Sequence, residues 1–321
     1  MASNLDTLVT VFGGSGFLGR HVVNALARRD FRIRVAVRRP DLTGHLQPLG
    51  KVGQIHAVQA NLRYPESVQA AMRDSHVAIN LVGILAESGA QKFDSVQARG
   101  PAAIAEAAAA VAARMVHVSA IGADADSASR YARSKAAGEQ AVLAAVPDAV
   151  IMRPSVVFGP EDAFTNRFAA LARMSPVVPL VGADTKLQPV YVGDVATAIA
   201  EAVEGRAKAG ATYELGGPEV MTMREIIELI LVTIDRRRLM LPLPFGLASL
   251  QAMLLQFAPG GLKLTPDQVA LLRVDNVVSD AAKAAGLTLQ GLGITPDSLQ
   301  AIVPSYLWRF RKTGQFARKS A

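Results

Sequence analysis

Short apolar runs alternate with stretches in which apolar residues recur every three or four positions over the first half of the chain. The runs predict buried strands and the periodic stretches predict amphipathic helices. The predicted strands are 8–12, 32–37, 55–59, 77–82, 114–119 and 150–153, and the predicted helices are 17–29, 65–73, 101–113 and 132–145. This alternation predicts an α/β fold with a doubly wound parallel sheet.

The pattern loosens after residue 155, where prolines at 160, 176, 179 and 189 interrupt it. We expect residues 1–155 to form the main domain and 156–321 to form a smaller C-terminal α/β lobe. Residues 188–195 are expected to return to the main domain, so that the two are partly interwoven.

The first predicted strand runs directly into a loop with glycines at 13, 16 and 19. Gly13 permits a tight turn, Gly16 lets the backbone approach a pyrophosphate, and Gly19 lets the next helix pack closely on the sheet. The pyrophosphate would lie at the N-terminus of that helix, so Phe17 and Leu18 are counted with the glycines as cofactor-binding residues. A glycine loop between a strand and a helix predicts a Rossmann-type nucleotide-binding domain.

The second predicted strand leads to Arg38 and Arg39, where a fold that prefers NAD places an acid for the ribose hydroxyls. An arginine at this point pairs well with a 2′-phosphate. The sequence therefore predicts NADP(H), with solvated arginines at a sheet edge as the alternative.

Two further turns follow predicted strands, Asn61-Leu62 and Leu81-Val82-Gly83. Both fall at the C-terminal edge of the predicted sheet, so we expect them beside the adenine and the nicotinamide ribose. Ordinary strand-end turns are the alternative.

Ser119 ends the fifth predicted strand, and Tyr131 and Lys135 are four residues apart in the next helix. That spacing places both side chains on one face of the helix. A lysine ammonium beside a phenol favours its ionised form, and Ser119 could hold a substrate oxygen. These three residues are the candidate acid–base site.

With these motifs, the chain resembles the extended and atypical short-chain dehydrogenases/reductases from Gly13 to about Asp194. The segment matching residues 153–160 lies beside the nicotinamide in that family, which implies cofactor contacts for Pro154 and Val157. The chain departs from the family's pattern at Asn61, Gln97 and Val82. These departures do not affect the expected cofactor binding. They leave open whether the protein catalyses a reaction or whether Ser119, Tyr131 and Lys135 are a vestigial acid–base site.

Four later segments carry a narrower resemblance: 188–195, 241–245, 275–279 and 306–311. With them the chain resembles the dehydrogenase-like accessory subunits of respiratory complex I, in the form found in alphaproteobacteria. The resemblance implies a protein that holds NADPH tightly on the peripheral arm of the complex, near the membrane, and takes no part in electron transfer.

The 321 residues are 50% hydrophobic and 19% charged, which excludes a disordered chain, and without cysteine there are no disulfides or cysteine metal sites. We predict no metal. The net charge of +7 is unevenly placed: six arginines against one acid, Asp30, lie within 28–39, five basic residues follow position 308, and the rest of the chain is net negative. Two local basic sites do not form a stripe over one face, so no nucleic-acid partner is expected.

Residues 239–262 contain no charged residue and are long enough to span a bilayer. Their prolines, glycines and glutamines argue against a transmembrane helix. A helix near 246–258, with Leu247, Leu250, Leu254 and Phe257 on one side, is expected to be either lobe core or a docking surface for a partner or membrane. The aromatic and basic residues from Tyr306 onward are expected to add to that surface.

The sequence thus favours an NADPH-binding accessory or assembly subunit of membrane-bound NADH:ubiquinone oxidoreductase, with a mainly structural cofactor and the peripheral-arm subunits as partners. Residues 1–6 resemble no secretory signal, so we expect a cytoplasmic protein held peripherally at the inner membrane. The alternative is a free-standing NADP-dependent reductase or epimerase in which Tyr131 is the general acid/base, Lys135 orients the ribose and Ser119 positions a substrate of unspecified identity. A redox-sensing regulator is a third hypothesis.

Overall fold

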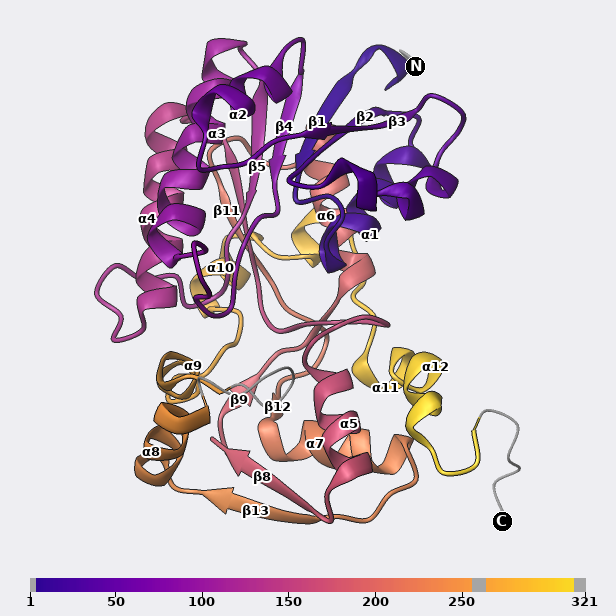
Figure 1. Ribbon diagram of the computed structural model, residues 1–321, viewed down its shortest axis with the longest axis vertical. Coiled ribbons are helices and arrows are strands. Elements are labelled where there is room, and N and C mark those ends of the chain that lie inside the picture. Colours follow the sequence, from indigo (N-terminus) through magenta and orange to yellow (C-terminus); the bar gives the residue numbers. More distant parts are fainter. Residues whose placement is uncertain (1–3, 256–263, 315–321) are drawn as a thin grey trace. The chain divides into compact units, whose positions relative to one another are not determined.

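The computed structural model describes residues 4–255 and 264–314, which form two compact units (Figure 1). The first contains the chain up to Pro154 together with Gly193–Leu215 and Ser279–Ile294. The second contains Ser155–Val192, Gly216–Val278 and the chain from Thr295 onward.

The first unit is built on one seven-stranded sheet with the order β11-β6-β5-β4-β1-β2-β3, in which all pairs are parallel. Its strands are β1 (Leu8–Phe12), β2 (Arg32–Val37), β3 (Ile55–Gln59), β4 (Val77–Asn80), β5 (Arg114–Val118), β6 (Val150–Pro154) and β11 (Thr212–Leu215). Its helices are α1 (Phe17–Ala27), α2 (Pro65–Met72), α3 (Arg99–Ala110), α4 (Arg130–Ala145), α6 (Val192–Val203) and α10 (Asp280–Ala284). The doubly wound parallel sheet predicted from the sequence is confirmed.

The strand order reverses at β1, which pairs with β2 on one side and with β4 on the other. Phe12, the last residue of β1, lies opposite Ala36 of β2 and Asn80 of β4. Ligands of open parallel sheets bind in the crevice outside the carboxyl ends of the strands at such a reversal. The glycine loop that follows β1 begins at this point.

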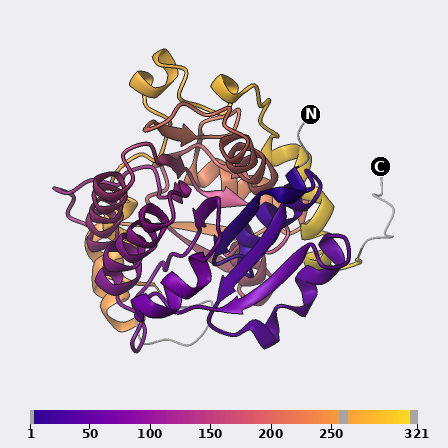
Figure 2. The ribbon, with the colours of Figure 1, turned by 90° about the horizontal axis from the view of Figure 1, so that it is seen from above.

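Helices cover both faces of this sheet, so all five residues of β1 are buried. Figure 2 shows the twisted sheet with helices on either side. On one face α2, α3 and α4 pack on the strands around Met72, Ile104 and Met115. On the other face lie α1 and α6, and Arg29, just after α1, forms ion pairs with Glu201 of α6 (2.7 Å) and with Glu204 just after α6 (2.9 Å).

The predicted strands match β1, β2 and β3 and differ from β4, β5 and β6 by one or two residues at their ends. β4 ends at Asn80 rather than residue 82, because the Asn80 side chain accepts the Val82 N–H that a longer strand would use in the sheet (3.0 Å). The short edge strand β11 was not predicted, since four residues carry little periodicity.

The second unit has its own core, in which Phe158, Leu180, Ile230 and Leu307 are fully or almost fully buried. Its three two-stranded sheets pair β7 with β10, β8 with β13 and β9 with β12. The strands are β7 (Val157–Phe158), β8 (Val177–Val181), β9 (Lys186–Leu187), β10 (Val190–Tyr191), β12 (Met221–Thr222) and β13 (Leu239–Leu243). The helices are α5 (Thr165–Met174), α7 (Met223–Thr233), α8 (Phe245–Leu255), α9 (Pro266–Leu271), α11 (Leu299–Ile302) and α12 (Pro304–Leu307).

The described part of the uncharged segment, residues 239–255, contains β13 and α8, and within the described residues no helix is long and apolar enough to cross a membrane. In α8 the buried residues are Ala248 and Ala252, whereas Leu247 and Leu250 are 59% and 61% exposed. Of the two alternatives left open by the sequence, lobe core and docking surface, the exposure of these two leucines argues against lobe core. The side chain of Leu254 and all of Phe257 lie outside the described residues.

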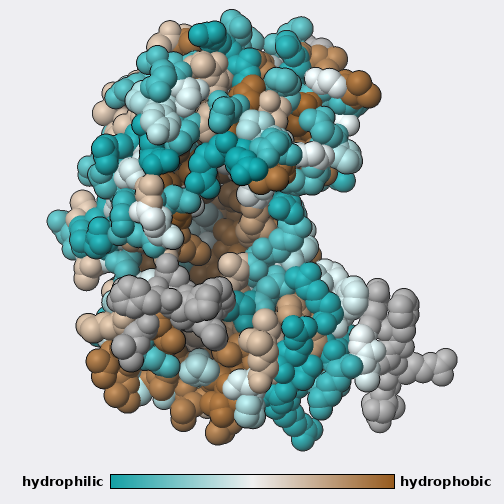
Figure 3. Space-filling model, in the orientation of Figure 1, coloured by the Kyte–Doolittle hydropathy of each residue, from teal (hydrophilic) through white to brown (hydrophobic). Residues whose placement is uncertain are grey.

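Exposed apolar side chains from β13 and α8 form what we call the apolar patch: Leu239, Leu241, Leu247, Leu250 and Met253. Figure 3 shows brown, hydrophobic atoms gathered where Figure 1 draws these two elements. Large exposed apolar patches are rare on soluble proteins and usually mark a site of interaction with a partner or a membrane.

The tail differs from its prediction. Tyr306 and Leu307 are buried in the core of the second unit rather than exposed for docking. Arg309 donates to the carbonyl oxygen of Pro160 (2.9 Å), and Arg311 donates to that of Thr233 (2.8 Å). The start of the tail thus holds the unit together, because its aromatic and basic side chains find partners within it.

Candidate nucleotide-binding site

A cavity of about 280 Å³ lies in the first unit, where the glycine loop meets the carboxyl ends of β2, β3 and β4. Many residues that the sequence singled out for cofactor binding line it: Gly13, Gly16, Arg38, Asn61, Leu62, Leu81, Val82 and Gly83. Arg63, Ile84, Gln91 and Val96 also line it, and no motif in the sequence pointed to them.

The glycine loop has the shape that the spacing predicts. Gly13 has φ +81°, which favours glycine, and its N–H donates to the carbonyl oxygen of Ala36 (3.2 Å). A Cβ on Gly19 would lie 2.4 Å from the carbonyl oxygen of Gly13, so only glycine lets α1 approach the loop. A Cβ on Gly16 would meet that oxygen alone, at 3.3 Å.

Helix α1 begins without a side-chain cap, because its N-cap residue is Gly16. Phe17, Leu18 and Gly19 form its first turn, and that turn contains no acidic residue. The first N–H groups of a helix have no partner within the helix and carry the positive end of its dipole. This end of the cavity is therefore suited to an anion such as a pyrophosphate.

The two arginines after β2 have different surroundings. Arg39 does not line the cavity; its Nη2 is 2.7 Å from Asp41 Oδ2 and its Nε is 3.0 Å from Asp41 Oδ1. This pairing raises the pKa of Arg39 through the hydrogen bond to Asp41. Arg38 lines the cavity, and no carboxylate pairs with it in the described part of the chain. Of these two neighbouring arginines, it is therefore Arg38 that is available to an anionic ligand.

Asn61 and Leu62 form a fixed turn after β3. Asn61 Oδ1 accepts the N–H of Arg63 (3.2 Å), and the Asn61 N–H donates to Ser67 Oγ (3.0 Å). Arg63 lies over the ring of Tyr64, with 5.8 Å between its guanidinium carbon and the ring centroid. The turn therefore brings a second arginine to the cavity that the motif search overlooked, although it directly follows Leu62 in the sequence.

The side chain of Lys135 is buried, and its Nζ donates to the carbonyl oxygen of Val118 (3.2 Å). Burial lowers the pKa of Lys135 to about 8, and the charge of Glu139 opposes that shift. A Cβ on Gly83 would lie 3.4 Å from Nζ, so the ammonium group adjoins a residue that lines the cavity. Lys135 is therefore a buried cation at the predicted ribose end.

Tyr131 is near this lysine, with 6.0 Å between Lys135 Nζ and the tyrosine ring centroid. Its ring packs edge-on against Phe93 at a centroid distance of 6.0 Å. Ser119 directly follows β5, and its buried Oγ has no hydrogen-bond partner in the described structure. The structure thus brings Tyr131 and Lys135 together, and Ser119 follows the residue whose carbonyl holds Lys135.

Comparison with known proteins shows the family to which the chain belongs. The family described as the RmlD substrate binding domain matches residues 7–244. The chain is 36% identical to NADH dehydrogenase (ubiquinone) 1 alpha subcomplex subunit 9, mitochondrial, of Arabidopsis thaliana, over 96% of this chain and 79% of that protein. The chain belongs to the subunit 9 family. The family match over residues 7–244 places the chain among the extended short-chain dehydrogenases/reductases.

Other relatives of this subunit 9 family member carry enzyme names. The chain is 37% identical to ceramide reductase of Caulobacter vibrioides over 61% of each chain. The crystal structure of Citrobacter sp. triphenylmethane reductase complexed with NADP(H) superposes with a TM-score of 0.73 over 93% of this chain and 99% of that one, at 17% identity. The last likeness shows the fold alone.

Three other residues that the sequence singled out do not line the cavity. Pro154 is buried at the end of β6, and Val157 belongs to β7 of the second unit. Gln97 is buried in a π-helical turn, Asp94–Ala98, and neither atom of its amide has a hydrogen-bond partner in the described structure. A π-turn often occurs at a functional site.

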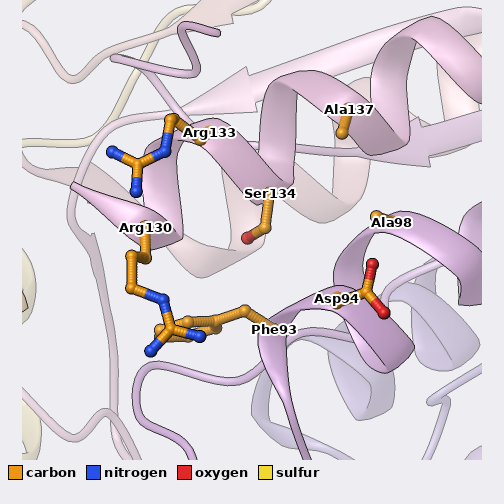
Figure 4. Close-up of a pocket in the computed structure, with 7 residues that line it drawn as sticks. All are labelled: Phe93, Asp94, Ala98, Arg130, Arg133, Ser134 and Ala137. Atoms are coloured by element: carbon orange, nitrogen blue, oxygen red, sulfur yellow. The ribbon is translucent and has the colours of Figure 1, made fainter. Parts of the chain in front are cut away.

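A second cavity, of about 250 Å³, lies between that π-turn and α4 (Figure 4). Arg130 and Arg133 flank it, but Arg130 pairs with Glu87 and Arg133 donates to the carbonyl oxygen of Ser127. Its acid, Asp94, pairs with Arg99 (2.7 Å). Because these charges already have partners, this cavity is a weaker candidate for a ligand site. Among the residues described, no cluster of His, Asp or Glu could hold a metal ion.

Proposed function

We propose that this protein binds NADPH in the first cavity and serves as an accessory subunit of membrane-bound NADH:ubiquinone oxidoreductase, with a mainly structural cofactor. The observation that carries the cofactor assignment is the contrast between Arg38, which lines the cavity without a carboxylate partner, and Arg39, which Asp41 occupies. The partner assignment is supported by the name of the Arabidopsis thaliana relative, NADH dehydrogenase (ubiquinone) 1 alpha subcomplex subunit 9, which matches 96% of this chain.

The residues present fit such a nucleotide. A Cβ on Gly16 would meet only the Gly13 carbonyl oxygen, so the loop leaves room for a pyrophosphate at the start of α1. Arg38 would hold the 2′-phosphate, and Asn61 and Leu62 would border the adenine. The turn Leu81–Gly83, with Tyr131 and Lys135, would border the ribose and nicotinamide. NADPH could supply a hydride when bound, but in this protein it would mainly stabilise the fold.

A structural role follows from linkage. A ligand present at about one hundred times its dissociation constant adds roughly 2.7 kcal/mol to the free energy of unfolding. Without a ligand, the buried Lys135 charge and the unpartnered Ser119 Oγ lower the free energy of unfolding. We infer that a tightly held nucleotide offsets these costs and keeps the first unit folded.

The apolar patch on the second unit supports attachment at the membrane. Its five side chains are each at least 49% exposed, and no charged residue occurs from Leu239 to Leu255. We propose that this surface docks on a peripheral-arm subunit near the membrane, which would place the protein peripherally on the membrane's cytoplasmic or matrix side.

A second candidate is a free-standing NADPH-dependent reductase. It is favoured by the likeness to ceramide reductase and by Lys135, whose pKa of about 8 lies near working pH. In that case Tyr131 would transfer a proton to the substrate oxygen. Turnover of a lipid carbonyl that vanishes in Tyr131→Phe would support this candidate and would contradict a purely structural cofactor.

The two arginines provide a matched test of the cofactor. NADPH and NADH are titrated into wild type, Arg38→Ala and Arg39→Ala. We expect wild type to prefer NADPH by about ten- to a hundredfold, since a hydrogen bond to a charged group contributes roughly 1.5–3 kcal/mol. Arg38→Ala should lose that preference and Arg39→Ala should keep it. Equal affinities of the wild type for the two nucleotides would reject the assignment.

A further inference from the structure

Asn80 and His117 form a buried pair beside the cavity, at the ends of β4 and β5. Their exposed fractions are 0% and 1%. Asn80 Oδ1 accepts the Val82 N–H (3.0 Å), and Asn80 Nδ2 is 3.1 Å from His117 Nδ1. Because a backbone N–H can only donate, the Asn80 oxygen must face Val82 and its NH₂ group must face the imidazole.

The direction of these bonds fixes the state of His117. The Asn80 NH₂ group donates, so His117 Nδ1 accepts and the ring is neutral, with its proton on Nε2. Burial and, secondarily, the charge of Lys135 lower the pKa of His117 to about 3. Nε2 is buried and has no hydrogen-bond partner in the described structure. An apolar side chain of similar size would avoid that penalty, so packing alone does not explain a histidine here.

The pair connects the turn that lines the cavity with the strand end that holds Lys135. Val82, which Asn80 holds, lines the cavity together with Gly83. The residue after His117 is Val118, whose carbonyl oxygen holds Lys135 Nζ (3.2 Å). Loss of the acceptor at His117 would leave the Asn80 amide free to rotate, and the Val82 N–H would then lose its fixed partner.

We infer that His117 is a positioning residue for the nucleotide: through Asn80 it holds the turn Leu81–Gly83 in the shape that binds the ribose. The inference rests on the proposed NADPH site and adds a residue that does not itself line the cavity. It predicts that the hydrogen-bond acceptor at position 117, rather than the size of the side chain, controls affinity.

The test compares NADPH dissociation constants of wild type, His117→Leu, His117→Asn and Ser75→Ala. The asparagine oxygen can replace Nδ1 as acceptor, whereas leucine cannot. Ser75→Ala is the matched control, because it breaks another buried polar pair of the same sheet, Ser75 Oγ to Thr10 Oγ1 (2.6 Å), at the opposite end of β4.

We expect His117→Leu to weaken NADPH binding about tenfold, His117→Asn to remain within about threefold of wild type, and Ser75→Ala to have no effect. Wild-type affinity in His117→Leu, or an equal loss in His117→Asn, would overturn the inference. If wild type binds no NADPH, the proposed site is rejected and the inference falls with it.

Nitrogen-15 spectra of the histidine rings test the Asn80–His117 pair in the absence of a ligand. This measurement does not need the His117→Leu variant and so remains possible if that variant does not fold. In wild type, His117 Nδ1 should be unprotonated and Nε2 protonated from pH 8 to pH 5. In Asn80→Asp, whose carboxylate cannot donate, a proton should appear on Nδ1. A protonated Nδ1 in wild type, or no change in Asn80→Asp, would contradict the pair.

Discussion

The hydroxyl group of Tyr306 donates a hydrogen bond to the buried carboxylate of Asp162, with 3.1 Å between Oη and Oδ2. The same carboxylate oxygen accepts from Thr165 Oγ1 (2.6 Å) and from the Gly159 N–H (2.9 Å). A residue near the C-terminus thus completes the hydrogen bonding of a buried charge before α5. The contact ties α12 to the core of the second unit.

Tyr306→Phe should lower the free energy of unfolding by about 2 kcal/mol, because a hydrogen bond to a buried charged group is lost. Burial and the Asp162 charge raise the pKa of Tyr306. A raised folded-state pKa gives stability that is present below the unfolded pKa, about 10, and is lost as the pH rises above it. Wild type should therefore lose stability from pH 10 to 11 more steeply than Tyr306→Phe in chemical denaturation. Parallel pH profiles would contradict this account.

Two glycines of the loop should separate folding from binding. Gly19→Ala should destabilise the first unit, because its Cβ would lie 2.4 Å from the Gly13 carbonyl oxygen. Gly16→Ala should fold nearly as well as wild type and lose NADPH affinity at least tenfold, since its methyl group would occupy the space of the pyrophosphate. Thermal denaturation and NADPH titration of both variants give the comparison. Unchanged NADPH affinity in a folded Gly16→Ala protein would contradict the proposed pyrophosphate site.

Much of the first unit could be predicted from the sequence, since strands buried on both faces are continuous apolar runs with helices between them. The different roles of Arg38 and Arg39 could not be predicted, because the pairing of Arg39 with Asp41 depends on the turn that follows β2. Tyr306 looks like part of a basic, exposed tail; its burial depends on Asp162, 144 residues earlier. For the leucines of α8 the sequence could not decide between core and docking surface, because helical spacing identifies a shared face and not what covers that face.

Replacing Lys135 should trade stability against binding. Lys135→Met removes a buried charge whose folded-state pKa, about 8, lies below its ordinary value of 10.5. We expect the ligand-free variant to gain on the order of 1 kcal/mol at pH 7 and to bind NADPH more weakly. The gain should shrink as the pH rises from 8 towards 10.5, because wild-type Lys135 becomes neutral when folded. Denaturation at pH 7 and pH 10 checks this; a variant less stable than wild type at pH 7 would argue against it.

The apolar patch should matter for attachment and not for folding. The double variant Leu247→Ser with Leu250→Ser should keep its melting temperature, because both side chains are exposed, and should be released from membranes more readily than wild type. Leu42→Ser is the control, since Leu42 is 63% exposed but belongs to the first unit. Sedimentation of membranes at several salt concentrations measures release. Equal retention of all three proteins would rule out the patch as the docking surface.

The central claim is tested most directly by solubilising native membranes gently, separating the complexes by size, and measuring this protein, NADH:quinone oxidoreductase activity and bound nucleotide in each fraction. We predict that the protein migrates with the activity and carries about one NADPH per chain, and that Tyr131→Phe changes neither. A protein that migrates alone, lacks NADPH, or turns over a small carbonyl substrate in a Tyr131-dependent reaction would contradict the account.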